Sequence, residues 1–164
     1  MLMNLLDEPS LQELRNNYGS GGGSEAELRE TWKKTVQSGL CMAGEALSMA
    51  THTLLNICRG GIHDHVEGGF HRYCVDRTWS LPHFEKMLYD QAQLIQLFSN
   101  AHCALKTANL PESESILEEF EAAVRGTIEY CQEHLFDAKT GLYFSAEDAD
   151  VDGQEGSHVT WTDE

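Results

Sequence analysis

The sequence predicts an all-α fold, because apolar residues recur every three or four positions over three long segments. These segments span residues 41–58, 80–107 and 112–135. In the last segment Phe120, Val124 and Ile128 fall on one face, which is typical of an amphipathic helix packed on a core. We expect the three helices to pack as neighbours.

Local signals place the ends of these helices. Gly60-Gly61 should end the first helix, because glycine readily adopts the left-handed conformation found just after a helix. Ser80 is a good N-cap for the second helix, and Pro82 fits its first turn. Asn109, followed by Leu-Pro, should end that helix. The acidic remainder, residues 136–164, is predicted to be loop-like and to contain one short strand.

The first 39 residues carry fewer signals. A short helix is predicted within residues 1–14, followed by a Gly/Ser linker at residues 19–24. Ser24 is a plausible N-cap for a further helix, since two glutamates follow it in the first turn. We therefore expect residues 1–39 to form short helices or poorly structured chain, and residues 40–164 to form the folded part.

Composition excludes several classes of function. The 164 residues include 27 acidic and 11 basic side chains, for a net charge of −16. Such a charge repels phosphate groups, so neither nucleic acid nor an anionic membrane is an expected partner. The five cysteines are widely spaced and include no C-x-x-C pair, which favours reduced thiols. We expect a soluble protein without a cofactor, cytoplasmic by default, with a secreted or organellar form left open if a leader is missing.

Residues 60–91 are the stretch most typical of a functional site. They combine histidines, carboxylates, aromatic side chains and four glycines, and the burial of so many ionisable groups in a core would be costly. Gly68-Gly69 would let the backbone approach a ligand closely and carry the next residues into a cavity.

The candidate catalytic residues are polar side chains that can carry a proton or a fixed charge. They are His65, His71, Arg72, His83, Glu85 and Asp90. The candidate substrate-binding residues are aromatic or polar neighbours that suit a sugar ring. They are Phe70, Tyr73, Asp76, Trp79, Lys86, Tyr89, Glu147 and Asp148.

A structural interpretation stands beside each functional one. The histidines would then simply hydrogen-bond loop carbonyl groups, and the aromatic side chains would pack beneath the loop. The pairs Glu85–Tyr89 and Lys86–Asp90 have the i, i+4 spacing of ordinary contacts within a helix.

Two metal patterns are also present, and neither predicts a metal site. His63, His65 and His71 have a spacing that matches no common zinc site. The DxDxDG stretch that begins at Asp148 matches the first half of a calcium-binding loop. Its twelfth position is Val159 instead of the bidentate glutamate, which leaves at most a weak calcium site.

The stretch GGIHDHVEGGFHRYCVDRTWSLPHFEKMLYDQ closely resembles a segment of the spermatogenesis-associated protein 20 family, also called thioredoxin-domain-containing or YyaL-like proteins. A second signature, GLYFSAEDADVDGQEG, follows it, and the resemblance extends over residues 41–161. Family members usually have glycine at the position of Glu67 and serine at that of Cys74, so the resemblance does not define the shape of the loop at these two positions.

The resemblance implies a partial α/α toroid of the six-hairpin glycosidase class, similar to N-acylglucosamine 2-epimerases. It also implies a longer protein, of which this chain would be a fragment without the family's thioredoxin-like domain. The implied function is carbohydrate-related, with a link to spermatogenesis and fertility and a sugar-like small molecule as partner. The alternative is a non-catalytic binding or regulatory fragment. The enzyme hypothesis predicts that His65, His71, Arg72, Glu85 and Glu147 converge on one open cavity.

Overall fold

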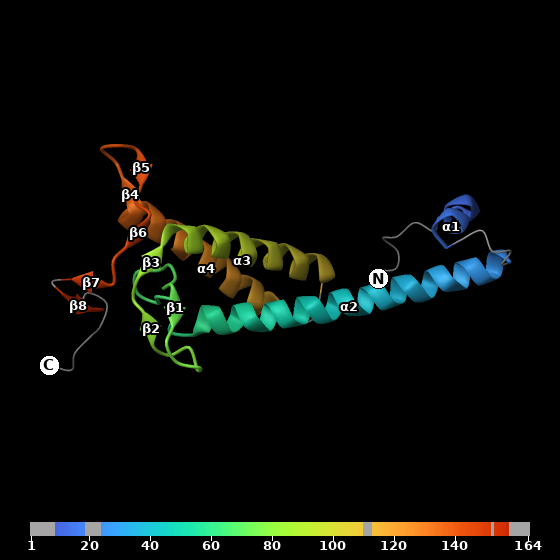
Figure 1. The fold of residues 1–164 in the computed structure, drawn as a ribbon, viewed down its shortest axis with the longest axis horizontal. Helices are drawn as coiled ribbons and strands as arrows, with labels where there is room; N and C mark the ends of the chain where they lie inside the picture. Colours follow the sequence, from blue (N-terminus) through green and yellow to red (C-terminus); the bar gives the residue numbers. More distant parts are fainter. Residues whose placement is uncertain (1–8, 19–23, 110–112, 152, 158–164) are drawn as a thin grey trace. The chain divides into compact units, whose positions relative to one another are not determined.

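A computed structural model describes residues 9–18, 24–109, 113–151 and 153–157. The chain divides into two compact units, Met1–Met49 and Ala50–Glu164. Within the described residues most of the structure is helical and the strands are two residues long, so the predicted all-α class is confirmed (Figure 1). The toroid arrangement remains a prediction.

The first unit contains α1 (Leu11–Tyr18) and the first part of α2 (Glu25–Arg59). Ser24 is the N-cap that the sequence predicts: its backbone N–H donates to Glu27 Oε2 at 2.8 Å, and the Glu27 N–H donates back to Ser24 Oγ at 3.4 Å. The helix predicted at residues 41–58 is the C-terminal part of this one continuous helix. Of the helix predicted within residues 1–14, the first eight residues lie outside the described part.

In the second unit, α3 (Leu88–Ala108) and α4 (Glu114–Tyr130) pack side by side (Figure 1). Phe98 of α3 and Phe120 of α4 are fully buried, and their ring centroids lie 5.1 Å apart. The chain continues from α4 into η2, one turn of π-helix at Cys131–Leu135. The end of the helix predicted at residues 112–135 is therefore confirmed, whereas its first residue lies outside the described part.

Four antiparallel pairs of short strands complete the second unit. They are β1 (Tyr73–Cys74) with β2 (Pro82–His83), β3 (Lys86–Met87) with β6 (Ala146–Glu147), β4 (Phe136–Asp137) with β5 (Leu142–Tyr143), and β7 (Asp150–Val151) with β8 (Gln154–Glu155). The short strand predicted in the acidic remainder corresponds to β5.

The predicted start of the second long helix at Ser80 is wrong. Residues 80–87 are extended and contain β2 and β3, and α3 begins at Leu88. The reason is backbone pairing with other segments. The Arg72 N–H donates to the Glu85 carbonyl oxygen at 2.8 Å, the Val75 N–H donates to that of Leu81 at 2.9 Å, and β3 pairs with the distant β6. These tertiary contacts outweigh the local helix-capping signals.

The end of α2 at Arg59 agrees with the prediction, but its cause is different. Neither Gly60 nor Gly61 has a positive φ. A Cβ on Gly61 would lie 2.4 Å from the Ser80 carbonyl oxygen, so the glycines are needed for close approach of two backbone segments. At the end of α3, by contrast, Asn109 is in the left-handed conformation, with φ 48°.

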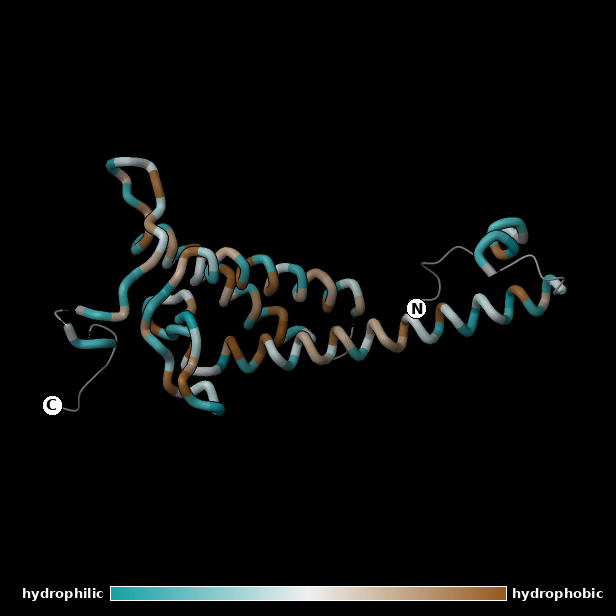
Figure 2. Tube along the Cα trace, in the orientation of Figure 1, coloured by the Kyte–Doolittle hydropathy of each residue, from teal (hydrophilic) through white to brown (hydrophobic). Residues whose placement is uncertain are grey.

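Hydrophilic and hydrophobic residues are mixed along the helices (Figure 2). Among the described residues, no helix combines the length and the apolar character that crossing a bilayer requires. All five cysteines lie in the described part and carry free thiols.

Candidate functional site

The site loop, residues 60–87, joins α2 to α3 and folds back onto α4. Gly68 and Gly69 have φ angles of 81° and 74°, which favour glycine. A Cβ on Gly68 would lie 2.7 Å from the Gly126 carbonyl oxygen, and one on Gly69 would lie 2.6 Å from the Tyr130 ring. The glycine pair therefore brings the loop against the protein's own helix, and not against a ligand as its composition predicts.

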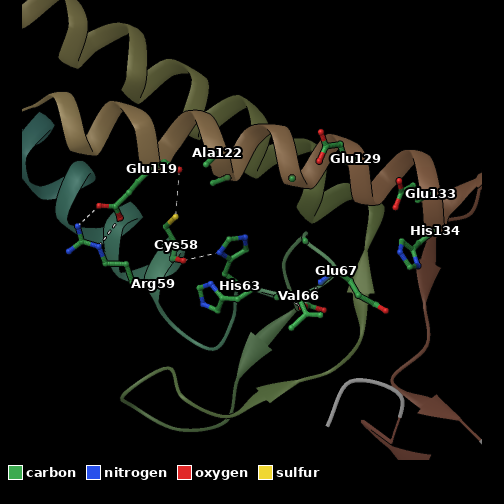
Figure 3. A pocket seen from close by; sticks show the side chains of 15 residues that line it. Cys58, Arg59, His63, Val66, Glu67, Glu119, Ala122, Glu129, Glu133 and His134 are labelled. Carbon is green, nitrogen blue, oxygen red and sulfur yellow. Dashed lines mark hydrogen bonds and ion pairs between the residues drawn. The ribbon is translucent and has the colours of Figure 1, made fainter. Parts of the chain in front are cut away.

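A cavity of about 840 Å³ lies between the beginning of this loop and α4 (Figure 3). Arg59 and Glu119 form an ion pair at one end, with Nη2 and Oε1 2.6 Å apart. Glu67, Glu133 and His134 lie at the other end (Figure 3). Small or apolar side chains lie between these ends together with two ionisable ones, His63 and Glu129 (Figure 3). The small or apolar ones are Val66, Ala122 and Ala123.

The predicted site residues do not converge on this cavity. Only His65 lines it; His71, Arg72, Glu85 and Glu147 do not. The His65 ring is held at the rim, since its Nε2–H donates to the Gly60 carbonyl oxygen at 3.2 Å.

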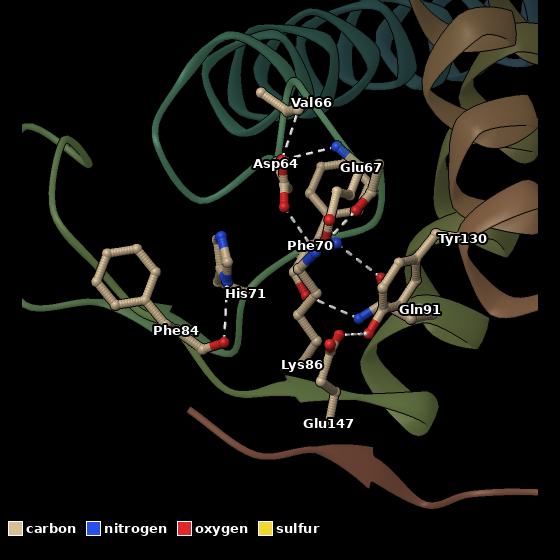
Figure 4. A network of polar contacts seen from close by, with 11 residues as sticks. Asp64, Val66, Glu67, Phe70, His71, Phe84, Lys86, Gln91, Tyr130 and Glu147 are labelled. Atoms are coloured by element: carbon tan, nitrogen blue, oxygen red, sulfur yellow. Dashed lines mark hydrogen bonds and ion pairs between the residues drawn. The ribbon is translucent and has the colours of Figure 1, made fainter. Parts of the chain in front are cut away.

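Beneath the loop, Lys86 is the centre of a buried polar network (Figure 4). Its side chain is 1% exposed, and its Nζ donates to Asp64 Oδ2 at 2.7 Å and to the Gly68 carbonyl oxygen at 3.1 Å. The same Nζ lies 4.3 Å from the centre of the Tyr130 ring. Burial opposes ionisation of Asp64, but hydrogen bonds from Lys86 and from two backbone N–H groups outweigh it and lower the pKa of Asp64 to about 2.

Two further contacts fix the network to α3 and β6. Gln91 forms a double hydrogen bond with the Phe70 backbone, accepting from its N–H at 2.8 Å and donating to its carbonyl oxygen at 2.7 Å. The Tyr130 hydroxyl donates to Glu147 Oε2 at 2.5 Å (Figure 4). Burial, followed by the hydrogen bond and charge of Glu147, raises the pKa of Tyr130. Phe70 and Glu147 thus stabilise the conformation of the loop, Phe70 through its backbone and Glu147 through its carboxylate.

Two histidines have the same role in the loop. His71 is 4% exposed, and its Nδ1–H donates to the Phe84 carbonyl oxygen at 3.2 Å. Burial, with a smaller effect from the charge of Lys86, lowers the pKa of His71 to about 4. The Nδ1–H of His63 donates to the Cys58 carbonyl oxygen at 2.9 Å, and burial lowers the pKa of His63 as well. Both rings are therefore neutral at pH 7.

On the outer side of the loop, charged side chains gather around His83. This His83 cluster consists of Arg72, His83, Glu85, Asp90 and Glu155. Arg72 Nη1 donates to Glu85 Oε2 at 2.8 Å. The Nδ1–H of His83 donates to Glu155 Oε1 at 2.6 Å, while its Nε2 lies 3.6 Å from Glu85 Oε2. Two histidine-flanking carboxylates and one guanidinium are thus brought together.

Asp90, in the first turn of α3, completes the His83 cluster. Its Oδ2 atom is buried and has no hydrogen-bond partner among the described residues. Burial raises the pKa of Asp90, the charge of Arg72 lowers it, and that of Glu85 raises it again, with a net increase. Asp90 therefore holds a proton more readily than an ordinary exposed aspartate does.

Two tyrosines flank the cluster. The Tyr73 ring lies 5.0 Å from that of His83, because β1 and β2 place these residues opposite each other. Tyr89 forms a side-chain hydrogen bond with Arg72. Both tyrosines are 48% exposed. The structure thus brings together six of the fourteen predicted residues. They are Arg72, Tyr73, His83, Glu85, Tyr89 and Asp90.

The remaining predicted residues lie elsewhere. Asp76 closes the turn between β1 and β2, accepting from the Thr78 side chain and from the backbone N–H groups of Ser80 and Leu81. These hydrogen bonds strongly lower the pKa of Asp76, and the one from the Thr78 hydroxyl has the largest effect. Trp79 lies in the same turn with a positive φ of 56°. Asp148 accepts from the Asp150 N–H just before β7.

The DxDxDG stretch contains β7, which pairs with β8 just after the stretch. Asp152 and Val159 lie outside the described residues. Across the part of the chain that the structure describes, no group of three or more His, Cys, Asp or Glu side chains is arranged to hold a metal ion.

Sequence reasoning did not select Asp64, Gln91, Tyr130 or Glu155. Gln91 was visible as a polar residue on the apolar face of a helix, at a position where α3 is completely buried. Glu155 was visible only as part of the second family signature, since it meets His83 across 72 residues of chain.

Comparison with known proteins agrees with the two signatures. The chain is 43% identical to spermatogenesis-associated protein 20 of Mus musculus over 124 residues, which are 71% of this chain and 14% of the mouse protein. It is 43% identical to the same protein of Homo sapiens over 123 residues, again 71% of this chain and 14% of the relative. An uncharacterized protein of Caenorhabditis elegans is 39% identical over 108 residues, 66% of this chain and 13% of that protein. No protein-family model matches.

The chain thus spans about 14% of the length of these mammalian relatives. The resemblance seen in the sequence is confirmed, and the chain is related to the spermatogenesis-associated protein 20 family, matching one part of those proteins.

Proposed function

We propose that the His83 cluster is an acid–base site that acts on a sugar or a similar hydroxy-carbonyl compound. The observation that carries the proposal is the convergence of His83, Asp90 and the Arg72–Glu85 ion pair on one side of the loop. A proton acceptor, a proton donor and a fixed positive charge are what enolisation next to a carbonyl group requires.

The roles follow from the environment of each group. His83 Nε2 takes the proton from the carbon next to the carbonyl group, and the C–H electron pair becomes the new C=C bond. The Asp90 carboxyl, whose pKa is raised, gives its proton to the carbonyl oxygen. Arg72 stabilises the negative charge that develops on that oxygen. Return of the proton from His83 to the same face, with removal of the hydroxyl proton by Asp90, regenerates the substrate, whereas delivery of a proton from solvent to the opposite face gives the epimer.

The wider role comes from the relatives. Their name associates them with spermatogenesis, and we extend that association to this chain. We also propose the toroid arrangement, a role in carbohydrate metabolism, and a thioredoxin-like domain joined to this segment in the longer proteins.

The test is a screen of the purified chain with free aldoses and N-acyl sugars in D₂O. Carbon-bound deuterium, detected by NMR, reports the enolisation step directly. His83→Gln and Asp90→Asn should each lower the exchange rate by about 10²-fold or more. His102→Gln, on α3 outside the cluster, is the matched control. No exchange with any of these sugars would reject the proposal, as would exchange that both cluster variants retain in full.

A second candidate function is binding without catalysis in the cavity beside α4. It is favoured because the cavity is separate from the His83 cluster and is lined by charged ends with apolar side chains between them. Such a cavity suits a small polar molecule. NMR titration of the ¹⁵N-labelled chain with the same sugars should then shift the signals of Val66 and Ala122. Glu67→Gln should weaken that binding while Glu118→Gln, on α4 outside the cavity, should not. Shifts confined to the His83 cluster would reject this second function.

A further inference from the structure

We infer that Glu155 is a positioning residue for His83: it holds a proton on Nδ1, so that Nε2 is the atom that takes and returns protons. This inference rests on the proposed function for its chemical purpose. Its geometric basis is independent of any substrate.

The hydrogen bond between the two side chains defines the tautomer. Glu155 Oε1 lies 2.6 Å from His83 Nδ1, and an ionised carboxylate can only accept. The proton of a neutral His83 ring is therefore on Nδ1. Such a carboxylate–histidine pair also stabilises the imidazolium that forms when Nε2 takes a second proton.

The environment of Nε2 leaves this atom available. Among the described residues Nε2 faces Glu85 Oε2, 3.6 Å away, which is too far for a hydrogen bond. Glu85 Oε2 already accepts from Arg72 at 2.8 Å. The Tyr73 ring lies 5.0 Å from the His83 ring and limits its rotation. Among the described residues, the ion-pair partners of the His83 ring are thus Glu155 at Nδ1 and Glu85, itself paired with Arg72, at Nε2, with Asp90 in the same cluster.

Packing places Glu155 beside His83 although 72 residues separate them. Glu155 ends β8, and the next residue, Gly156, has a φ of 71° and lies against Phe84. A Cβ on Gly156 would be 2.5 Å from the Phe84 ring, so this close approach requires glycine. The Gly156 N–H also donates to the Ala149 carbonyl oxygen at 2.8 Å. The second family signature therefore supplies the carboxylate, and its glycine docks the β7–β8 hairpin next to the first signature.

The experiment is to determine the His83 tautomer by ¹⁵N NMR of the labelled chain at pH 8, without substrate. The wild-type ring should have its proton on Nδ1. Glu155→Ala should move the proton largely to Nε2, because the acceptor for Nδ1–H is removed. Glu155→Gln should retain the Nδ1–H form, because its amide oxygen accepts the same hydrogen bond without a charge. Glu129→Ala, on α4 away from His83, is the control and should leave the spectrum of the ring unchanged.

Two results would overturn the inference: an Nε2–H ring in the wild type, or the same tautomer in wild type and Glu155→Ala. The readout depends on protons alone, so a chain without sugar activity can still show the predicted tautomers. In that case the proposed function fails and the positioning contact stands. If the D₂O exchange assay detects activity, Glu155→Ala should reduce the rate at saturating substrate and leave KM nearly unchanged, since Glu155 acts through His83.

Discussion

Lys86 and Asp64 form an ion pair beneath the site loop, with Nζ and Oδ2 2.7 Å apart and side chains that are only 1% and 8% exposed. Removal of one partner leaves the other charge buried without compensation. We therefore expect Lys86→Met to lower the free energy of unfolding by about 3–5 kcal/mol. Urea denaturation followed by circular dichroism measures this loss.

Lys139→Met, which changes an exposed lysine in the β4–β5 hairpin, is the control and should alter the free energy of unfolding by less than about 0.5 kcal/mol. The double variant Asp64→Asn/Lys86→Met should be less destabilised than the sum of the two single variants, because neither charge is then left alone. Additive losses in the double-mutant cycle would show that the two residues do not act as a pair.

Gly69 should tolerate no larger residue. Its φ of 74° disfavours any side chain, and a Cβ there would lie 2.6 Å from Tyr130 Cδ1. We expect Gly69→Ala to lower the free energy of unfolding by about 1–3 kcal/mol. Gly126→Ala is the matched control within α4, where an added Cβ meets nothing within 4 Å. It should stabilise the chain by about 0.5–1 kcal/mol. Equal midpoints of thermal unfolding for the two variants would contradict this explanation of the glycine pair.

His71 should make stability depend on pH between about 6.5 and 4. Its pKa falls from 6.5 to about 4 on folding, mainly by burial. Between about pH 6.5 and 4, His71 is therefore protonated in the unfolded chain but neutral in the folded chain. The stabilisation is complete above pH 6.5 and is lost as the pH falls towards 4, by up to about 3 kcal/mol.

His71→Asn tests this dependence, because its amide N–H can still donate to the Phe84 carbonyl oxygen but does not titrate. The free energy of unfolding of this variant should decrease less than that of the wild type between pH 7 and pH 4. His102→Asn, outside the loop, should follow the wild-type curve. Parallel curves for wild type and His71→Asn would reject the neutral buried state.

The helical content was predictable because it follows from local patterns. The apolar periodicity of α3 and α4 and the Ser24–Glu27 capping box are patterns of residues close together in the chain. The face predicted to be buried in α4 is only partly right, since Ile128 is 40% exposed. The buried residues of α4 are Phe120, Ala123, Thr127 and Tyr130. The start of α3 was not predictable in this way. Ser80 and Pro82 look like a helix N-terminus, yet residues 80–87 pair with residues 72–75 and with β6, and no local pattern contains those partners.

The site was predictable as a region but not as an arrangement. Composition alone identifies residues 60–91, and six of the selected residues lie in or beside the His83 cluster. The sequence could not separate these from His71 and Lys86, which face inward, since burial is decided by the packing of the loop on α4. Nor could it identify Glu155, because the contact joins two signatures far apart in the chain.

Asp90 should show the opposing effects on stability and activity that are expected of a functional residue. Its Oδ2 is buried without a hydrogen-bond partner among the described residues, and its pKa is raised on folding, first of all by burial. A carboxyl whose pKa is raised by folding stabilises the folded chain when protonated, and this stabilisation is lost as the pH rises through the folded-state pKa. Because this carboxyl is buried without a partner among the described residues, its ionisation opposes folding, and a neutral amide at the same position avoids that cost. We expect Asp90→Asn to keep or increase the temperature of thermal unfolding at pH 7, while it removes the proposed exchange activity.

Asp148→Asn, in an exposed turn, is the control and should change neither property. A clear decrease in the unfolding temperature of Asp90→Asn at pH 7 would mean that the ionised carboxylate stabilises the fold, and Asp90 would then be a structural residue of α3.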